Sequence, residues 1–299
     1  MVEEKKILQH KFVKKEFIDK GWSGDKKYCV SDEQGNKFLL RVSPIEQYER
    51  KKSEYQLMNK VAMLGVPMCK PLEFGTSDEG VFSIQTWIDG VDAEENVHNL
   101  TGEEQYFYGF EAGRILKEIH RIPAPDGIED WEIYFNCKIN RKIKMYEECP
   151  IKYENGQEFI DYINAHRHLL NGRPQTYQHG DYHIGNMMIG NDKQLYIIDF
   201  NRNDFGDPWE EFNRIVWCAQ ATPLFATGMV NGYFDNDVPM KFWELLALYI
   251  SSNTLSSVPW AIPFGDEQVQ VMVKQAKDVL RWYDDMKNAV PSWYKGIKF

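Results

Sequence analysis

The sequence predicts an α+β protein of two lobes, with an antiparallel sheet and one main helix in residues 1–90 and a larger, mostly helical lobe in residues 91–299. Three observations predict this class. Short β-rich runs separated by turn residues occupy most of the first 90 residues. Apolar residues then recur at helical spacing. A polar segment at residues 179–200 contains a short hairpin flanked by two aspartates and an asparagine.

Turn residues divide the first lobe into strands. The run GWSG, with Ser23 and Gly24 at its end, forms a turn between FID and KKYCVS, and its glycines would let backbone N–H groups approach phosphate oxygens. After a second turn at Gly35 and Asn36, the run KFLLRV is apolar and β-rich. It predicts the third strand, whose basic residue is Arg41.

A helix and a strand pair complete this lobe. Residues 45–64 are rich in helix formers, and the stop at Gly65 before Pro67 predicts where the helix ends. The runs PLEFG and VFSIQTWI then predict two strands that lead into Asp89 and Gly90. This polar, turn-prone connection is the expected linker between the lobes.

The second lobe opens with helix signals. Thr101 and Glu104 have the spacing of a capping box. Apolar residues from Ala112 to Ile119 then repeat at helical spacing and predict a buried stripe. A basic stretch at residues 138–152 has interleaved isoleucines, which favours an amphipathic helix with a solvated basic face over a nucleic-acid patch.

The segment HGDYHIGNMMIGNDKQLYIIDF, residues 179–200, has the residue types that phosphoryl transfer requires. This chemistry needs a carboxylate that accepts the proton of the attacking hydroxyl, which Asp181 provides, and oxygen ligands that hold Mg²⁺ against nucleotide phosphates. Asn186 and Asp199 are hard ligands of that kind. A hairpin turning at residues 190–192 would bring Asp199 back beside Asn186, so all three side chains are expected to face one cleft.

The motif resembles the aminoglycoside phosphotransferase and choline kinase-like family of small-molecule kinases. The resemblance rests on His179, Gly180 and Asp181, on Asn186, and on the run IIDF that contains Asp199. It implies a protein-kinase-like fold and an ATP- and Mg²⁺-dependent transfer to a hydroxyl. It leaves GTP open as the nucleotide. The chain departs from the protein-kinase pattern, because glycine precedes Asp181 and Asn201 follows Phe200.

The resemblance also assigns roles in the first lobe. It implies that Arg41, which replaces the usual lysine, contacts nucleotide phosphates and pairs with Glu54, with Glu49 as an alternative. It places Trp87 and Ile88 at the linker backbone that binds adenine, and the glycine turn over the phosphates. In the second lobe it gives His179 a role in bracing the catalytic loop and Asp207 a role in anchoring it.

Charge bears on the partners. The net charge is −10, which argues against nucleic acid and anionic membranes as partners. Residues 1–90 carry fifteen basic and fourteen acidic side chains, so a balance of −11 falls on residues 91–299. This favours a cationic acceptor. The resemblance to the family implies a small hydroxylated acceptor, with an aminoglycoside first. Five cysteines without a CxxC pair, and an N-terminus without a signal-peptide core, fit a reducing cytoplasm.

Other classes of function remain open or are disfavoured. The sequence has no GxxxxGK[ST], GxGxxG, HExxH or GxSxG motif, which disfavours P-loop, Rossmann, zincin and serine-hydrolase chemistry. Choline, a sugar or another antibiotic is the alternative acceptor. A nucleotide-binding pseudokinase that acts as a scaffold or sensor is the alternative of a different class, and Arg41 and the missing glycine after Phe200 are its best support. The short connection after Asp199 disfavours a protein kinase.

Overall fold

A computed structural model describes residues 12–19 and 24–296. The chain divides into two compact units, one formed by residues 1–95 and 186–203 and the other by residues 96–185 and 204–299. The predicted lobes met at residue 90, whereas here the first unit continues to Glu95 and also takes back the hairpin that carries Asn186 and Asp199. The candidate metal ligands therefore belong to the first unit, and Asp181 belongs to the second.

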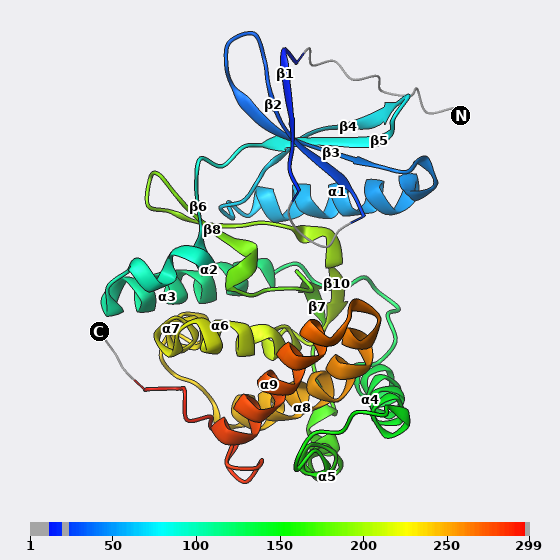
Figure 1. Ribbon diagram of the computed structural model, residues 1–299, viewed down its shortest axis with the longest axis vertical. Helices are drawn as coiled ribbons and strands as arrows, with labels where there is room; N and C mark the ends of the chain where they lie inside the picture. The colour runs from blue at the N-terminus through cyan, green and yellow to red at the C-terminus, as the bar shows by residue number, and fades with distance from the viewer. Residues whose placement is uncertain (1–11, 20–23, 297–299) are drawn as a thin grey trace. The chain divides into compact units, whose positions relative to one another are not determined.

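The first unit is built on a five-stranded antiparallel sheet with the strand order β1-β2-β3-β5-β4 (Figure 1). One long helix, α1, follows β3 in the chain and contacts β4 and β5. The bounds are β1 Lys14–Phe17, β2 Lys26–Ser31, β3 Lys37–Ser43, α1 Tyr48–Met63, β4 Pro71–Ser77 and β5 Gly80–Thr86.

The two faces of this sheet differ in chemistry, because successive side chains of a strand point to opposite faces. On one face, five buried apolar side chains form a core: Val30, Leu40, Val42, Phe82 and Ile84. The alternate positions of β2 and β3 form the other face. There, Lys27 lies opposite Arg41 and Cys29 lies opposite Leu39. The sheet therefore presents two facing cationic residues beside a less polar pair.

A second, three-stranded sheet with the order β6-β8-β9 also belongs to the first unit. Its strands are β6 Gly90–Asp92, β8 Met187–Gly190 and β9 Leu195–Ile197. Strands β8 and β9 form the predicted hairpin, in which Met187 pairs with Ile197. The sheet thus joins the end of the expected linker to the segment that carries the candidate metal ligands.

The second unit is mostly helical (Figure 1). Its one sheet among the described residues is the antiparallel pair β7 and β10. The bounds are α2 Ala93–Asn96 at the boundary of the units, α3 Gly102–Ile119, α4 Trp131–Glu148, α5 Gln157–His166, β7 Thr176–Gln178, β10 Asp204–Gly206, α6 Ile215–Ala221, α7 Pro223–Tyr233, α8 Met240–Ala261 and α9 Asp266–Trp282. The 3₁₀ turn η6, Glu210–Arg214, precedes α6.

Helices α3 and α7 make a close backbone contact through glycines. A Cβ on Gly109 or Gly113 would overlap the backbone of α7, and a Cβ on Gly228 or Gly232 would overlap the backbone of α3. The predicted stripe of α3 is buried, and the predicted capping box is present at its N-terminus. The fold class is confirmed, with an antiparallel sheet in the N-terminal unit and helices in the C-terminal unit.

One prediction about α4 is wrong in part. We expected the basic residues of this stretch to form a solvated face, but Lys138 and Lys142 are only half-exposed, whereas Arg141 and Lys144 are exposed. The reason is spacing. Lys138 and Lys142 lie four residues apart on the side of α4 that also carries the buried Phe135 and other core residues.

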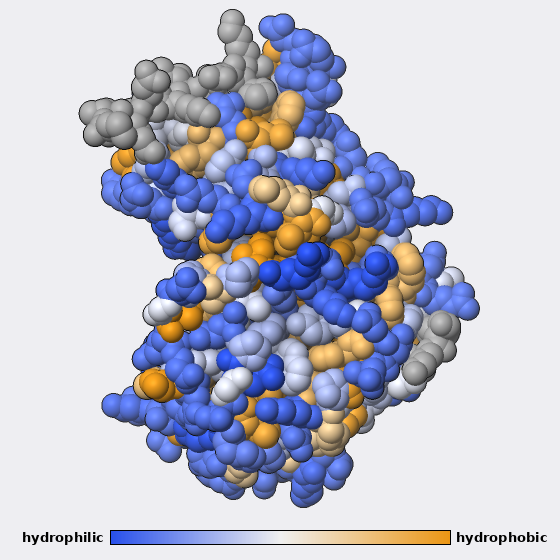
Figure 2. Space-filling view, turned by 180° about the vertical axis from the view of Figure 1, so that it is seen from behind, coloured by the Kyte–Doolittle hydropathy of each residue, from blue (hydrophilic) through white to orange (hydrophobic). Residues whose placement is uncertain are grey.

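Figure 2 shows one face of the molecule, on which hydrophilic residues are widespread and apolar residues also reach the surface. The larger exposed apolar side chains include Val13, Met63, Ile133 and Trp260, which come from different elements. Among the helices of the described residues, none has the length and apolar character needed to cross a membrane.

Candidate functional site

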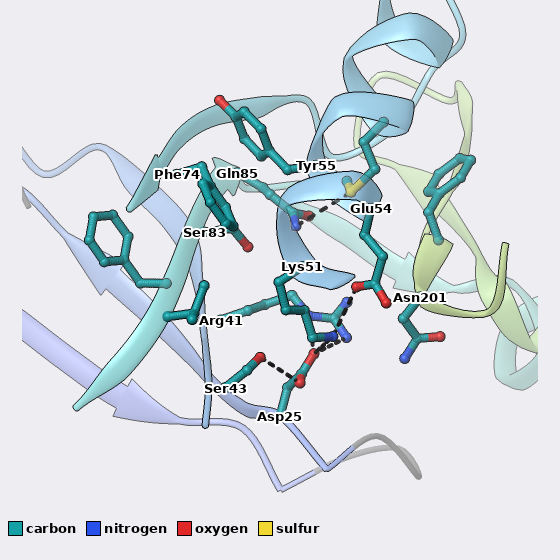
Figure 3. A pocket seen from close by; sticks show the side chains of 14 residues that line it. Asp25, Arg41, Ser43, Lys51, Glu54, Tyr55, Phe74, Ser83, Gln85 and Asn201 are labelled. Atoms are coloured by element: carbon teal, nitrogen blue, oxygen red, sulfur yellow. Dashed lines mark hydrogen bonds and ion pairs between the residues drawn. The ribbon is translucent and has the colours of Figure 1, made fainter. Parts of the chain in front are cut away.

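Arg41, on β3, joins two carboxylates of the first unit. Its Nη1 donates to Oδ1 of Asp199 at 2.9 Å, and its Nε and Nη2 donate to Oδ2 of Asp25 at 3.2 and 3.0 Å. Ser43 donates a further hydrogen bond to Asp25 at 2.7 Å (Figure 3). Burial alone would raise the pKa of Asp25, but Arg41, Ser43 and Lys51 outweigh it and hold that pKa below its ordinary value.

Glu54 has different partners from the one we predicted. It does not pair with Arg41, because Lys51 donates to Glu54 at 2.9 Å from one turn earlier on α1, and Arg50 donates at 2.9 Å from four residues earlier. Lys51 also donates to Asp25 at 3.0 Å. A chain of ion pairs therefore runs from Arg41 through Asp25 and Lys51 to Glu54 (Figure 3). The alternative partner, Glu49, does not line this pocket.

The pocket around this chain has a volume of about 30 Å³. That is room for one or two water molecules and far too little for a nucleoside. Besides the charged residues, its lining includes apolar side chains of α1 and the sheet, among them Met58, Phe74 and Phe82. The ion pairs therefore tie α1 to the sheet, and they position Arg41 toward Asp199.

Asn186 and Asp199 are brought together by the hairpin. The N–H of Ile198 donates to the carbonyl oxygen of Asn186 at 3.0 Å, which extends the pairing of β8 and β9 by one step. Asp199 has φ +66°, a left-handed conformation that few residues other than glycine adopt. Such strain is typical of functional sites. The two residues supply an amide and a carboxylate oxygen, a donor set that fits Mg²⁺ together with nucleotide phosphates and water.

Lys27 is a candidate that the sequence analysis missed. It lies on β2 opposite Arg41, and its Nζ is 4.0 Å from Oδ2 of Asp199. Its side chain is only 14% exposed, and burial lowers its pKa despite the attraction of Asp199. The signal in the sequence was weak, because Lys26 and Lys27 are adjacent and only the register of the sheet shows which of them faces Arg41.

Trp87 and Ile88 line a second pocket of the first unit, with a volume of about 470 Å³. Small-molecule pockets have volumes in this range. The rest of its lining comes from residues 65–68, from the end of β5 and from the β8–β9 hairpin, and includes Asp89 and Tyr196. Leu39 and Arg41 are not part of it. The side chains at the expected linker thus line a different surface from the cationic face of the sheet.

In the second unit, the HGD loop is held from several sides. His179 is fully buried and accepts a hydrogen bond from the N–H of Asp181 at 3.3 Å. Gly180 has φ +84°, which explains why glycine suits this position, and its N–H donates to Glu211 at 3.0 Å. The hydroxyl of Tyr182 donates to a carbonyl of α3 at 2.7 Å. Asp181 is thus presented by a loop with fixed neighbours.

Asp207 lies at the centre of a buried network. Arg173 donates to both of its carboxylate oxygens, at 2.6 and 2.8 Å, and the Tyr249 hydroxyl donates at 2.5 Å. The amide of Gln178, which directly precedes His179, donates to the Asp207 carbonyl at 2.8 Å. This geometry connects Asp207 to the strand that leads into the HGD loop.

Asp181 itself faces two basic side chains of its own unit. Arg214 Nε lies 3.4 Å from Asp181 Oδ1, and His183 Nε2 lies 3.7 Å from the same oxygen. Sequence analysis gave no role to Arg214, since it is separated from Asp181 by 33 positions and belongs to no motif.

Of the predicted glycine turn, Gly24 lies in a bend before β2, while Gly21, Trp22 and Ser23 lie outside the described residues.

The fold and these residues define a class, the bilobal kinase-like phosphotransferases. A family model described as the phosphotransferase enzyme family matches residues 15–243, well over half of the chain. The chain belongs to this family, and it is a small-molecule kinase. No curated protein gives a significant match to the sequence.

Solved structures show the same fold at low identity. A choline/ethanolamine kinase family protein from Mesorhizobium loti is 13% identical with a TM-score of 0.65, over 91% of this chain and 90% of that one. A thermostable mutant of aminoglycoside phosphotransferase APH(4)-Ia is 15% identical with a TM-score of 0.64, over 90% and 94%. Amicoumacin kinase hAmiN, solved with AMP-PNP, Ca²⁺ and its ligand, is 13% identical with a TM-score of 0.61, over 92% and 90%.

Proposed function

We propose that this protein transfers the γ-phosphoryl group of ATP to a hydroxyl of a small molecule, with Mg²⁺ as the metal. The observation that carries the proposal is the placement of Asn186 and Asp199 at the end of one hairpin, beside Arg41 and Lys27. Two oxygen donors next to two cations suit a metal-bound triphosphate. Structures of similar proteins with ADP, and with AMP-PNP and Ca²⁺, support a nucleotide and a divalent metal as cofactors.

Each residue of the first unit has a proposed task. Asn186 and Asp199 would hold Mg²⁺, which when bound neutralises charge on the β- and γ-phosphates. Arg41 and Lys27 would bind phosphate oxygens, and Arg41 would then exchange part of its contact with Asp199 for the nucleotide. The adenine base of the nucleotide would lie toward Leu39 and Cys29, which follow Arg41 and Lys27 on the same face of the sheet. The linker backbone at Trp87 and Ile88 would be its hydrogen-bonding partner.

Asp181 of the second unit would accept the proton of the acceptor hydroxyl. Its carboxylate is 19% exposed, so it is accessible to a ligand while the loop around it is held by Glu211 and His179. His179 would act by holding the loop, since it is fully buried. General-base catalysis of this kind contributes about 10²–10⁴-fold to rate.

The finer prediction is an aminoglycoside acceptor, and structures of aminoglycoside phosphotransferases support it as the first class to test. The fold alone does not fix the acceptor. One observation points elsewhere, because Arg214 Nε and His183 Nε2 lie 3.4 and 3.7 Å from an oxygen of the Asp181 carboxylate. The acceptor is therefore proposed only as a small hydroxylated molecule, and its charge is argued separately below.

The test measures ADP release by the purified protein with ATP and Mg²⁺, across aminoglycosides, choline, sugars and hydroxy acids. We expect turnover that depends on both an acceptor and Mg²⁺, and that falls by at least about 100-fold in Asp181→Asn. Nucleotide binding should survive in that variant. Binding of ATP without acceptor-dependent turnover would favour the pseudokinase instead, and undiminished turnover in Asp181→Asn would remove Asp181 from the role of base.

A further inference from the structure

Helix α4 directs two lysines toward η6. Lys138 and Lys142 lie one helical turn apart, and Lys138 Nζ is 3.1 Å from Oε1 of Glu210. Glu210 is nearly buried and is also contacted by Gln178. Arg214, at the other end of η6, is one of the charges that act on Lys142. We call Lys138, Lys142 and Arg214 the basic cluster.

The basic cluster reaches the proposed general base. Arg214 Nε lies 3.4 Å from Oδ1 of Asp181, and the Arg214 side chain is 28% exposed. All of these residues belong to the second unit, as Asp181 does, whereas the residues proposed to bind the nucleotide belong to the first. The cluster is therefore on the part of the chain that would bind the acceptor.

The charges in this cluster do not balance. Three cations meet two carboxylates, Glu210 and Asp181, and Glu210 is already paired with Lys138. Among the described residues, Lys142 has no hydrogen bond or ion pair. Burial, together with the positive charges of Lys138, Arg214 and Arg141, lowers the pKa of Lys142 to about 7, although Glu210 acts in the opposite direction. Glu210 attracts this half-buried ammonium but is already paired with Lys138, so the ammonium remains unfavourable and a bound anion would relieve that cost.

We propose that the acceptor carries an anionic group, a carboxylate or a phosphate ester, which binds Arg214 and Lys142 while the acceptor hydroxyl meets Asp181. This inference rests on the proposed kinase function. A guanidinium binds both kinds of anion through its planar fork, and an ammonium adds a second contact. Because Arg214 and Asp181 are in direct contact, the anionic group and the reacting hydroxyl must lie within a few bonds of each other.

The net negative charge of residues 91–299 suggested that the acceptor is cationic, which is opposite to the anionic acceptor proposed here. Exposed charges farther away than about 8 Å are largely screened at physiological salt, so charges in direct contact with the ligand decide its preference. A polycationic acceptor with its hydroxyl at Asp181 would bring positive charge close to Arg214. Many of the acids that produce the net charge lie elsewhere, such as Asp235, which pairs with Lys117 at the surface.

The experiment compares initial rates of ADP release for three matched groups of acceptors. The acids are D-glycerate, D-gluconate and glycerol 3-phosphate, the uncharged analogues are glycerol and D-glucose, and the cations are choline and kanamycin. We expect a kcat/KM at least about tenfold higher for acids than for their uncharged analogues. Comparing kcat/KM for D-glycerate and for glycerol 3-phosphate shows whether the site prefers a carboxylate or a phosphate group.

Two substitutions in α4 test whether Lys142 causes the preference for acids. In Lys142→Met, the KM for the preferred acid should rise about 10- to 100-fold while the KM for ATP stays the same, since a hydrogen bond to a charged group is lost. Lys144→Met is the matched control, because Lys144 is on the same helix but exposed and pairs with Glu148. Its KM for the acid should be unchanged. Circular dichroism and thermal unfolding confirm that both variants fold.

The outcomes separate the two proposals. Faster turnover of uncharged or cationic acceptors than of acids would overturn the anionic acceptor and leave the kinase in place. An acid preference that persists unchanged in Lys142→Met would also overturn the assignment of this cluster. Absence of acceptor-dependent ADP release from all three groups would count against the kinase itself, and the inference would fall with it.

Discussion

Arg41 and Asp199 form an ion pair in which Nη1 of the arginine lies 2.9 Å from Oδ1 of the aspartate. The third strand of the sheet is thus linked directly to the residue proposed to hold the metal. In a nucleotide-bound state the same carboxylate would face Mg²⁺ and the same guanidinium would face phosphate. The pair therefore holds both groups close together before the nucleotide binds.

The first prediction concerns the Asp199 carboxylate. Asp199→Asn keeps the shape of the side chain but removes the charge that Arg41 contacts and that we propose binds Mg²⁺. We expect Mg²⁺-dependent ADP release to fall by about 10²–10³-fold, the scale found when one electrostatic contact to a reacting group is lost. Asp78→Asn, in the exposed turn between β4 and β5, is the control. Full turnover in Asp199→Asn would exclude the proposed metal role.

The second prediction separates the stability of the Arg41 pair from its function. Arg41→Met would leave Asp25 with fewer partners in a site where its side chain is only 5% exposed. We expect the free energy of unfolding to fall by about 3 kcal/mol, as when one partner of a buried ion pair is removed. Urea denaturation measures this change, and ATP titration of the folded variant should show weaker binding.

Asp25→Asn added to Arg41→Met provides the control. It removes the carboxylate that lost its partner, so part of the stability should return. ATP binding should not return, because the cation remains absent. Recovery of both properties in the double variant would show that Arg41 acts only through the structure of the sheet and does not contact the nucleotide.

The third prediction tests Lys27 as a phosphate ligand. Lys27→Met should raise the KM for ATP about tenfold, the effect of one lost hydrogen bond to a charged group. Lys26→Met changes the neighbouring exposed lysine, whose side chain points to the other face of β2, and should leave this KM unchanged. Equal effects of the two substitutions would show that only the general positive charge of the strand matters.

The sequence was sufficient to predict the elements of the first lobe, helix α3 and the hairpin of the motif. Helix-forming spacing and a capping box located α3, and the run KFLLRV located β3. These signals are local, because a turn, a cap or an alternation is encoded within a few residues. Asp181, Asn186 and Asp199 could be proposed for the same reason, since the roles predicted for them rest on residue type and spacing in one segment.

Partnerships between distant residues could not be predicted. Glu54 was expected to pair with Arg41, but Lys51 on the same helix is closer to it, and Asp25 takes the arginine instead. Arg214 reaches Asp181 only through the path of the chain after β10. The choice of ion-pair partner depends on the register of the strands and on the rotation of the helix about its axis. Neither can be predicted from the composition of the sequence.

The fourth prediction concerns the anchor of the HGD loop. Asp207→Ala should lower the free energy of unfolding by about 3–5 kcal/mol, because Arg173 and Tyr249 lose their buried partner. Asp204→Ala, in the exposed part of β10, is the control and should change stability by less than about 0.5 kcal/mol. Thermal unfolding measures both. Similar losses in the two variants would show that the network has no special role.

The last prediction follows from the basic cluster and concerns pH. Lys142 has a pKa lowered to about 7 by burial and by the neighbouring cations, so its ammonium is charged below pH 7 and becomes neutral above it. Binding of an anionic acceptor should therefore weaken as pH rises through 7 and over the range up to about 9. We expect kcat/KM for the acid to fall across this range while the KM for ATP stays nearly constant.

Lys142→Met should lack this pH dependence, because it has no proton to lose at that position, and Lys144→Met should keep it. Uncharged acceptors should show no matching fall in the wild-type protein, since they do not depend on the ammonium. If their profile falls in parallel with that of the acids, the titrating group acts on catalysis itself and not on recognition of the anion. The pH profile thus distinguishes a binding role of Lys142 from an effect on the base.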